Sequence, residues 1–325
     1  MFDLRNNVVN FEVFFRSGQF PIILLSQHTA LLMERTMKRL TLLAASMLIA
    51  TNTLAAEQSN LTFDVYNADQ NSFYVNSTLI IGETEVMVID TGFTKADALR
   101  IAAKVLDTGK TLKTIFISQA DPDYYFGAEV LHSLFPEAHI ITTPAVRKVI
   151  EEKLPTKLKV WAPRMGDNAP VTPYIPTAYT ASSLTIDGHT IEIHGTDGDI
   201  AHRPYLWIPS EKAVLGNVSI YGTNLHLWMA DAQSNNSQTL WSKQLKEIQS
   251  LKPEIVVPGH MISGTELNVS SIQYSQRYLQ DFKQAKKTTK NSEQLIEKMN
   301  EKYGDAALPV ALSIGAKVHK GEMEW

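Results

Sequence analysis

The segment at residues 117–127, ISQADPDYYFG, constrains the fold of this chain more than any other part of its sequence. Residues 112–117 form a short β-branched and aromatic run, which predicts a buried strand. Residues 126–134 carry apolar side chains at helical spacing, which predicts a helix. A strand that runs through a polar loop into a helix places the loop side chains at the carboxyl edge of a sheet. We therefore expect a ligand site in this loop.

Two other strand ends carry chemically important side chains. Residues 71–81 and 85–89 alternate as a pair of strands that ends in an Asp-Thr-Gly sequence beginning at Asp90. An aspartate at such a position predicts a side chain that fixes a turn or orients a loop. Far downstream, an apolar run that predicts a buried strand delivers His260 into a loop after Pro-Gly.

Strands that alternate with helices over the rest of the chain predict a layered α/β architecture in one domain with two similar halves. The other predicted strands cover residues 62–67, 138–142, 182–194, 204–209, 212–216 and 254–257. The other predicted helices cover residues 95–106, 144–153, 238–251, 271–287 and 292–303. Residues 157–180 carry aromatic side chains among four prolines, so we expect an irregular ordered loop that is a lid, a pocket wall or only a surface covering.

In this order the motifs resemble those of the metallo-β-lactamase-fold hydrolases. The signature of that family is Asp-Thr-Gly, then Thr-His-x-His-x-Asp-His with a following glycine, then a late Pro-Gly-His. Further similarity to the Vmh-type branch lies at residues 123–127, 207–210, 227–231 and 316–325. The resemblance implies an αββα sandwich, with a metallo-β-lactamase-like domain at residues 57–263 and a helical extension at 264–325 packed on it.

The resemblance also implies a metal site in which most of the histidines are replaced. Asp123 keeps the family aspartate, Tyr124 stands at the third histidine of the cluster, and His260 keeps the last histidine. The implied metal ligands are Gln119, Asp121, Asp123, Asp199 and His260, with His226, Asp231 and Asn217 as alternates.

The chemistry of this donor set differs from that of a zinc site. Zinc prefers nitrogen and sulfur ligands, whereas the chain has no cysteine and one matched histidine. The oxygen-rich set suits manganese, magnesium or calcium, would hold zinc weakly, and is also compatible with no cation at all. Without a metal, clustered carboxylates would raise one another's pKa and could form an acid–base pair. Asp121 or Asp123 could instead cap the following helix, and His260 could be a hydrogen-bonded loop residue.

The N-terminal part of the chain has the layout of an export signal. Basic residues at 38–39, an apolar run at 40–50 and small residues near 56 predict a signal peptide over residues 37–56, with residues 1–36 as an upstream extension. The apolar run is too short for a good membrane span, so we expect a periplasmic or secreted mature chain without one. Without residues 1–56 the formal charge is 25 − 31 = −6, which argues against a nucleic-acid partner.

Two functions follow as hypotheses. In the first, the protein is an exported hydrolase that acts on an ester, lactone or amide. Asp121, Asp123 and His260 would hold a cation, completed by Asp199 or Asp231, whose bound water attacks the carbonyl carbon. Tyr124 would donate a hydrogen bond to the developing oxyanion. In the second, the protein is a catalytically inactive relative that binds a small-molecule ligand or serves as a scaffold in the periplasm.

Overall fold

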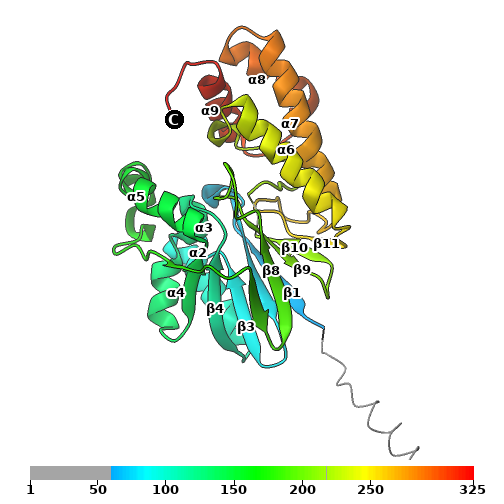
Figure 1. Cartoon of the computed structure of the whole chain (residues 1–325). Coiled ribbons are helices and arrows are strands. Elements are labelled where there is room, and N and C mark those ends of the chain that lie inside the picture. Colours follow the sequence, from blue (N-terminus) through cyan, green and yellow to red (C-terminus); the bar gives the residue numbers. More distant parts are fainter. Residues whose placement is uncertain (1–59, 217) are drawn as a thin grey trace, which may run out of the picture. The chain divides into compact units, whose positions relative to one another are not determined.

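The computed structural model describes residues 60–216 and 218–325 (Figure 1). The predicted upstream extension at 1–36, the predicted signal peptide at 37–56 and the candidate ligand Asn217 lie outside the described residues. In the part of the chain that the structure describes, no helix combines the length and the apolar character needed to cross a bilayer.

The first sheet is formed mainly by the N-terminal part of the described chain. Its strands, in spatial order, are β1 (Thr62–Asn67), β2 (Asn76–Ile81), β3 (Glu85–Ile89), β4 (Thr111–Ile117), β5 (His139–Thr142) and β6 (Thr177–Ala178). The first three strands pair antiparallel, and β3 to β6 pair parallel. The parallel strands need crossover connections, and the helices in these connections cover the outer face of the sheet.

The second sheet belongs to the later part of the chain. Its spatial order is β11 (Ile255–Val256), β10 (Ala213–Leu215), β9 (Tyr205–Ile208), β8 (His189–His194) and β7 (Ser183–Ile186). The predicted strand region at 182–194 is therefore a hairpin of two strands. All pairs are antiparallel except β10 with β11.

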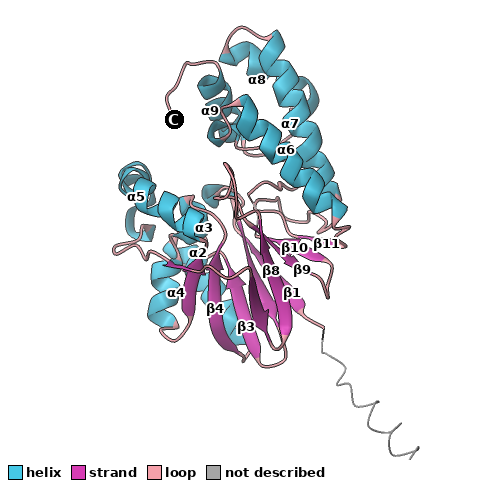
Figure 2. Cartoon of the chain, in the orientation of Figure 1, coloured by secondary structure: helices cyan, strands magenta, loops and turns pink. Residues whose placement is uncertain are grey.

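The helices fall into two groups, one associated with each sheet (Figure 2). The first group is α2 (Lys95–Asp107), α3 (Pro122–Tyr125), α4 (Ala128–Leu134) and α5 (Pro144–Met165). The second group is α6 (Asn235–Ser250), α7 (Ser270–Thr288), α8 (Ser292–Tyr303) and α9 (Pro309–His319). Short 3-10 turns lie at η1 (Gln70–Ser72), η2 (Gly166–Asn168) and η3 (Met229–Asp231).

Alternation along the strands divides the apolar side chains among three layers. On β3, Val86 and Val88 face the first helix group, whereas Met87 and Ile89 lie in the core between the sheets. On β9, Leu206 lies in the same central core. The next residue, Trp207, points to the other face of the sheet and packs with the second helix group. Because both faces of both sheets are covered, the architecture is the predicted αββα sandwich. The C-terminal helices belong to the helical layer on the outer face of the second sheet.

The prediction of an irregular loop at residues 157–180 was wrong for residues 157–165, which are helical. Helix α5 does not end near residue 153 but continues to Met165. Its inward face has the helical spacing of Leu154, Leu158, Trp161 and Met165, all of which contact the core under the first sheet. Pro155 and Pro163 are exposed, so the backbone hydrogen bonds that they cannot donate are lost on the solvent side of the helix.

Two other predicted boundaries moved for backbone reasons. Strand β2 starts at residue 76 because η1 and the left-handed residues Phe73 (φ 56°) and Tyr74 (φ 59°) precede it. The helix predicted at 126–134 begins two residues later, as α4, and the short helix α3 that precedes it was not predicted. Helix α9 was not predicted.

Candidate functional site

The loop at residues 118–127 is held by a small set of hydrogen bonds. Asp90, with a left-handed φ of 63°, accepts hydrogen bonds from both Ser118 N and Ser118 Oγ at 2.7 Å. Thr91 N donates to the carbonyl oxygen of Tyr124 at 2.8 Å. Burial raises the pKa of Asp90 to about 7, although both bonds from Ser118 act to lower it. The prediction that Asp90 orients the loop is confirmed.

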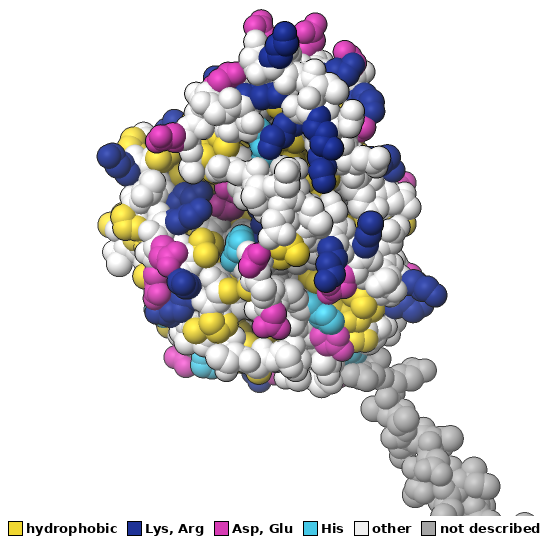
Figure 3. Space-filling view, turned by 45° about the horizontal axis from the view of Figure 1, so that its top comes forward, with side chains coloured by type: hydrophobic (Ala, Val, Ile, Leu, Met, Phe, Trp, Pro, Cys, Tyr) yellow, Lys and Arg dark blue, Asp and Glu magenta, His cyan; other side chains and the backbone are white. Residues whose placement is uncertain are grey.

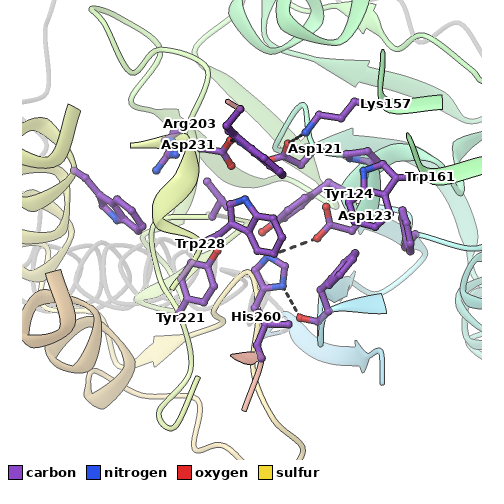
Figure 4. A pocket seen from close by; sticks show the side chains of 17 residues that line it. Asp121, Asp123, Tyr124, Lys157, Trp161, Arg203, Tyr221, Trp228, Asp231 and His260 are labelled. Atoms are coloured by element: carbon purple, nitrogen blue, oxygen red, sulfur yellow. Dashed lines mark hydrogen bonds and ion pairs between the residues drawn. The ribbon is translucent and has the colours of Figure 1, made fainter. Parts of the chain in front are cut away.

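A small pocket lies beside this loop (Figure 4). It is lined by Phe73, Phe93, Asp121, Pro122, Asp123, Tyr124, Lys157, Trp161, Arg203, Val218, Tyr221, Trp228, Asp231, Trp241, His260, Leu308 and Trp325. The cavity measures about 40 Å³, which is room for about three water molecules. Aromatic side chains form much of its wall, and its charged and other polar groups come from the 118–127 loop, α5, η3, Arg203, Tyr221 and His260. Figure 3 shows how charged and apolar side chains are distributed over one face of the molecule.

His260 and Asp123 form a buried pair at the base of the pocket. His260 Nδ1 lies 2.9 Å from the carbonyl oxygen of Phe73, so Nδ1 carries the proton and Nε2 keeps its lone pair. His260 Nε2 lies 3.5 Å from Asp123 Oδ2. Burial lowers the pKa of His260 to about 4, while burial and then the nearby charge of Asp121 raise the pKa of Asp123 well above its ordinary value. The pair therefore places a neutral imidazole beside a carboxyl group whose affinity for a proton is raised.

Asp121 belongs to a separate ion pair. It stands at the N-cap position of α3, yet its side chain makes no cap hydrogen bond. Lys157 Nζ on α5 lies 2.9 Å from Asp121 Oδ1 instead. Burial acts to raise the pKa of Asp121, but the lysine charge holds it below its ordinary value. Asp121 is therefore an ionised partner of a lysine and not a helix cap.

The phenol of Tyr124 is a buried donor that faces the pocket. The side chain has no exposed area, and its hydroxyl has no hydrogen-bond partner among the described residues. Figure 4 shows the ring extending from the loop toward Trp228 in the middle of the pocket. Burial, and then the charge of Asp123, raises the pKa of Tyr124 well above its ordinary value, so the hydroxyl keeps its proton. A buried donor of this kind needs an acceptor from water or from a ligand.

Asp231 and Trp325 close another side of the pocket. Trp325 Nε1 donates a hydrogen bond to Asp231 Oδ1 at 2.6 Å. The rings of Trp325 and Trp228 have centroids 5.6 Å apart. Burial, and then the charge of Asp121, raises the pKa of Asp231. The sequence predicted Asp231 only as an alternate site residue, and the structure brings it to the same pocket as Asp121, Asp123 and His260.

Three of the candidate ligands do not line this pocket. The amide oxygen of Gln119 accepts a hydrogen bond from the adjacent backbone N–H at 2.6 Å. Asp199 is exposed and accepts from Asn236 Nδ2 at 2.9 Å. His226 Nδ1 lies 2.9 Å from the hydroxyl of Tyr278, inside the core of the second helix group. These three side chains are engaged elsewhere.

The donor set that remains does not fit the metal site implied by the resemblance. Across residues 60–216 and 218–325, no group of three histidine, aspartate or glutamate side chains is arranged to hold a metal ion. Asp121 is already neutralised by Lys157, and an ammonium group beside the site disfavours a second cation. Asp123 and His260 remain as a pair, which is fewer protein ligands than a hydrolytic zinc site normally has.

Residues 157–180 were expected to form a lid, a pocket wall or a surface covering, and two of them, Lys157 and Trp161, line this pocket from a helix and not from a loop. Trp161, on α5, makes edge contacts with Phe73 at 5.3 Å and Phe93 at 5.6 Å between ring centroids. Lys157 lies one turn earlier on the same helix, so the two side chains share a face. The helical spacing from residue 154 to 165 was the signal that could have found them. Nothing local in the sequence indicates that Trp325 belongs to the site.

Comparison with known proteins agrees with the fold. A model of the metallo-beta-lactamase superfamily matches residues 71–260, more than half of the chain, and the protein belongs to that superfamily. A solved metallo-beta-lactamase family protein from Thermus thermophilus is 14% identical, with a TM-score of 0.57 over 81% of this chain and 92% of that one. A metallo-beta-lactamase from Pontibacter korlensis is 17% identical, with a TM-score of 0.49 over 68% of this chain and 100% of that one. No curated protein sequence matches the chain.

Proposed function

We propose that the pocket hydrolyses a small ester, lactone or amide with the chain's own acid–base groups. Membership of the metallo-beta-lactamase superfamily supports a hydrolase-like function in general. The observation that carries the proposal is the His260–Asp123 pair: Nδ1 of His260 is fixed on Phe73, and Nε2 faces a carboxyl group 3.5 Å away. This pair combines a proton acceptor and a proton donor in one buried site.

The protons can be balanced without a further reactant. His260 Nε2 takes a proton from water as the water oxygen bonds to the carbonyl carbon. The unpartnered hydroxyl of Tyr124 donates to the oxyanion that forms. Asp123 gives its proton to the leaving oxygen or nitrogen as the carbonyl carbon releases it. The imidazolium then returns a proton to the Asp123 carboxylate, which restores both groups.

Two directions of pKa shift support this assignment of roles. A pKa of about 4 makes His260 a weak base in the resting site, yet keeps it neutral at physiological pH. The raised pKa of Asp123 favours the protonated form of its carboxyl group, which is the form that can donate a proton. Once Asp123 has given up its proton, its negative charge stabilises the neighbouring imidazolium. His260 is therefore a stronger base during the reaction than its pKa in the resting site indicates.

Hydrolysis of a panel of chromogenic acetate esters, lactones and anilides tests the proposal. His260→Gln and Asp123→Asn should each lower kcat about 100-fold or more, and Tyr124→Phe about tenfold to 100-fold. Asp197→Asn, at an exposed carboxylate, is the matched control and should leave kcat unchanged. Full activity in the folded His260→Gln protein would refute the role of the pair. Ligand binding without turnover in the wild type would favour the binding-protein alternative.

The pH profile supplies a second test of the same pair. Because His260 must be neutral, kcat/KM should rise as pH increases through about 4. Because Asp123 must be protonated, kcat/KM should fall again when pH exceeds the raised pKa of that carboxyl group. His260→Gln should abolish the acidic limb. A profile without an acidic limb in the wild type would contradict the assignment of His260 as the base.

Metal dependence separates this proposal from the oxygen-rich metal site considered from the sequence. We expect less than one equivalent of zinc per chain after purification without chelator, and no loss of turnover in EDTA. Turnover that disappears in EDTA and returns with manganese, magnesium or calcium would show that Asp121, Asp123 and His260 hold a cation after all.

We also propose that the protein is exported. The basic, apolar and small-residue segments at 37–56 support cleavage before the described chain begins. N-terminal sequencing of the protein from a periplasmic fraction or culture medium should find a chain that starts near residue 56 or 57. A mature protein that retains residues 1–36 would contradict cleavage.

A further inference from the structure

Trp325 lies on the pocket wall, where it contacts three side chains, Trp228, Asp231 and Lys157. Its indole N–H donates to Asp231 on η3 at 2.6 Å, and its ring lies against Trp228, with 5.6 Å between the centroids. The ammonium group of Lys157 lies 5.7 Å from the centroid of the Trp325 ring. The ring thus has an aromatic neighbour, a cation near its face and an acceptor for its N–H.

The segment that carries Trp325 is anchored before it reaches the pocket. The carboxylate of Glu322 accepts hydrogen bonds from Ser292 N at 2.8 Å and from the Ser292 hydroxyl. Lys320 Nζ donates to the carbonyl oxygen of Lys286 at 2.8 Å. Residues 323–325 extend from this anchor, and Trp325 is 43% exposed. The indole can therefore leave the pocket without breaking the contacts that hold α8 and α9.

The size of the cavity shows why the position of Trp325 matters. With the indole in place the cavity measures about 40 Å³, whereas sites for drug-sized ligands measure about 300–1,000 Å³. A substrate with a ring therefore cannot enter fully unless a wall side chain moves. Trp325 is half exposed, whereas Trp228 is more buried and Tyr124 is fully buried.

We propose that Trp228, Asp231 and Lys157 form an aromatic subsite that Trp325 fills in the free protein and that a ligand ring with an N–H donor fills when it displaces the indole. This inference rests on the proposed function in one respect: the ring that the subsite binds would be the non-reacting part of the ester, lactone or amide substrate. An indole-like ring can donate its N–H to Asp231, pack against Trp228 and lie near the ammonium group of Lys157, as the ring of Trp325 does. A ring without N–H leaves the half-buried carboxyl group of Asp231 without its partner, which disfavours binding.

Calorimetric titration of the full chain with indole and with 1-methylindole tests the subsite, because the two probes differ in the N–H donor. Trp325→Ala should bind indole at least about tenfold more tightly than the wild type, and about tenfold more tightly than it binds 1-methylindole. The preference for indole should disappear in Trp325→Ala combined with Asp231→Leu. Met323→Ala is the matched control from the same segment and should bind indole as weakly as the wild type.

Two results would overturn the subsite: equal affinity of Trp325→Ala and wild type for indole, or equal affinity of Trp325→Ala for the two probes. If Trp325→Ala does not fold, the wild type gives the answer by nuclear magnetic resonance. Saturating indole should then move the Nε1–H signal of Trp325 toward the position of an exposed indole, and an unmoved signal refutes displacement.

The hydrolytic proposal and the subsite can fail separately. If the pocket has no hydrolytic activity, indole binding to Trp325→Ala is still expected. If the subsite is wrong, hydrolysis of small acetate esters is unaffected. If both hold, Trp325→Ala should raise kcat/KM for indoxyl acetate, which joins an indole ring to an ester, relative to an acetate ester without N–H.

Discussion

Lowering the pH from 7 to 5 should destabilise the protein through His226, and His226→Gln should remove about 2 kcal/mol of that loss. His226 is 2% exposed, and its Nδ1 lies 2.9 Å from the hydroxyl of Tyr278. Burial lowers its pKa to about 4, against about 6.5 in the unfolded chain. The folded state therefore binds fewer protons, and stability falls as pH decreases through 6.5 and levels off below 4. For one such group, the loss between pH 7 and pH 5 is about 2 kcal/mol.

Urea unfolding of the wild type and His226→Gln at pH 7, 6 and 5 measures this effect. Glutamine can still hydrogen-bond to Tyr278 but does not titrate, so the variant should lose about 2 kcal/mol less than the wild type over this range. His139→Gln changes an exposed strand histidine and should follow the wild type. Equal pH dependence in wild type and His226→Gln would refute the reasoning, whatever the contribution of other buried histidines.

Three further changes test the scaffold and the pocket wall. Gly127→Ala would place Cβ 2.0 Å from the carbonyl oxygen of Thr91, so it should cost at least about 3 kcal/mol of unfolding free energy or prevent folding, and a Tm equal to wild type would disprove the contact. Asp187→Ala removes a carboxylate that accepts hydrogen bonds from the β2–β3 turn, with an expected loss of about 1 kcal/mol in urea. Lys157→Met should cost about 2 kcal/mol by leaving Asp121 unpaired, and adding Asp121→Asn should recover most of it, which thermal melts of both variants check.

The sheets and the 118–127 loop could be predicted because their signals are local. Alternation on β3 separates Val86 and Val88 from Met87 and Ile89, and each pair lies in the layer that this period predicts. Asp90, at a strand end before glycine, was correctly expected to orient the loop. In these cases a residue's role depends on neighbours only a few positions away.

The rest of the site depends on contacts that local patterns do not contain. The four prolines of residues 157–180 suggested an irregular loop, but α5 includes the first of them, Pro163. Exposed prolines are tolerated in this helix because its other face is well packed. Trp325 reaches Asp231 across 94 positions, so no window of sequence could join them. Asp199 was expected to complete a metal site, but tertiary structure places it on the surface with Asn236.

The bonds that hold the 118–127 loop have a consequence for how this protein could change over time. Apart from the hydroxyl of Ser118, the loop contributes backbone atoms to the bonds that tie it to residues 90–92. The side chains of Gln119, Asp121 and Tyr124 take no part in these bonds. Substitutions at these three positions can alter the reactivity of the pocket while the chain still folds. Membership of the superfamily therefore predicts the fold of this protein better than it predicts the reaction. Because these three side chains do not hold the loop in place, histidines can be introduced at their positions by design.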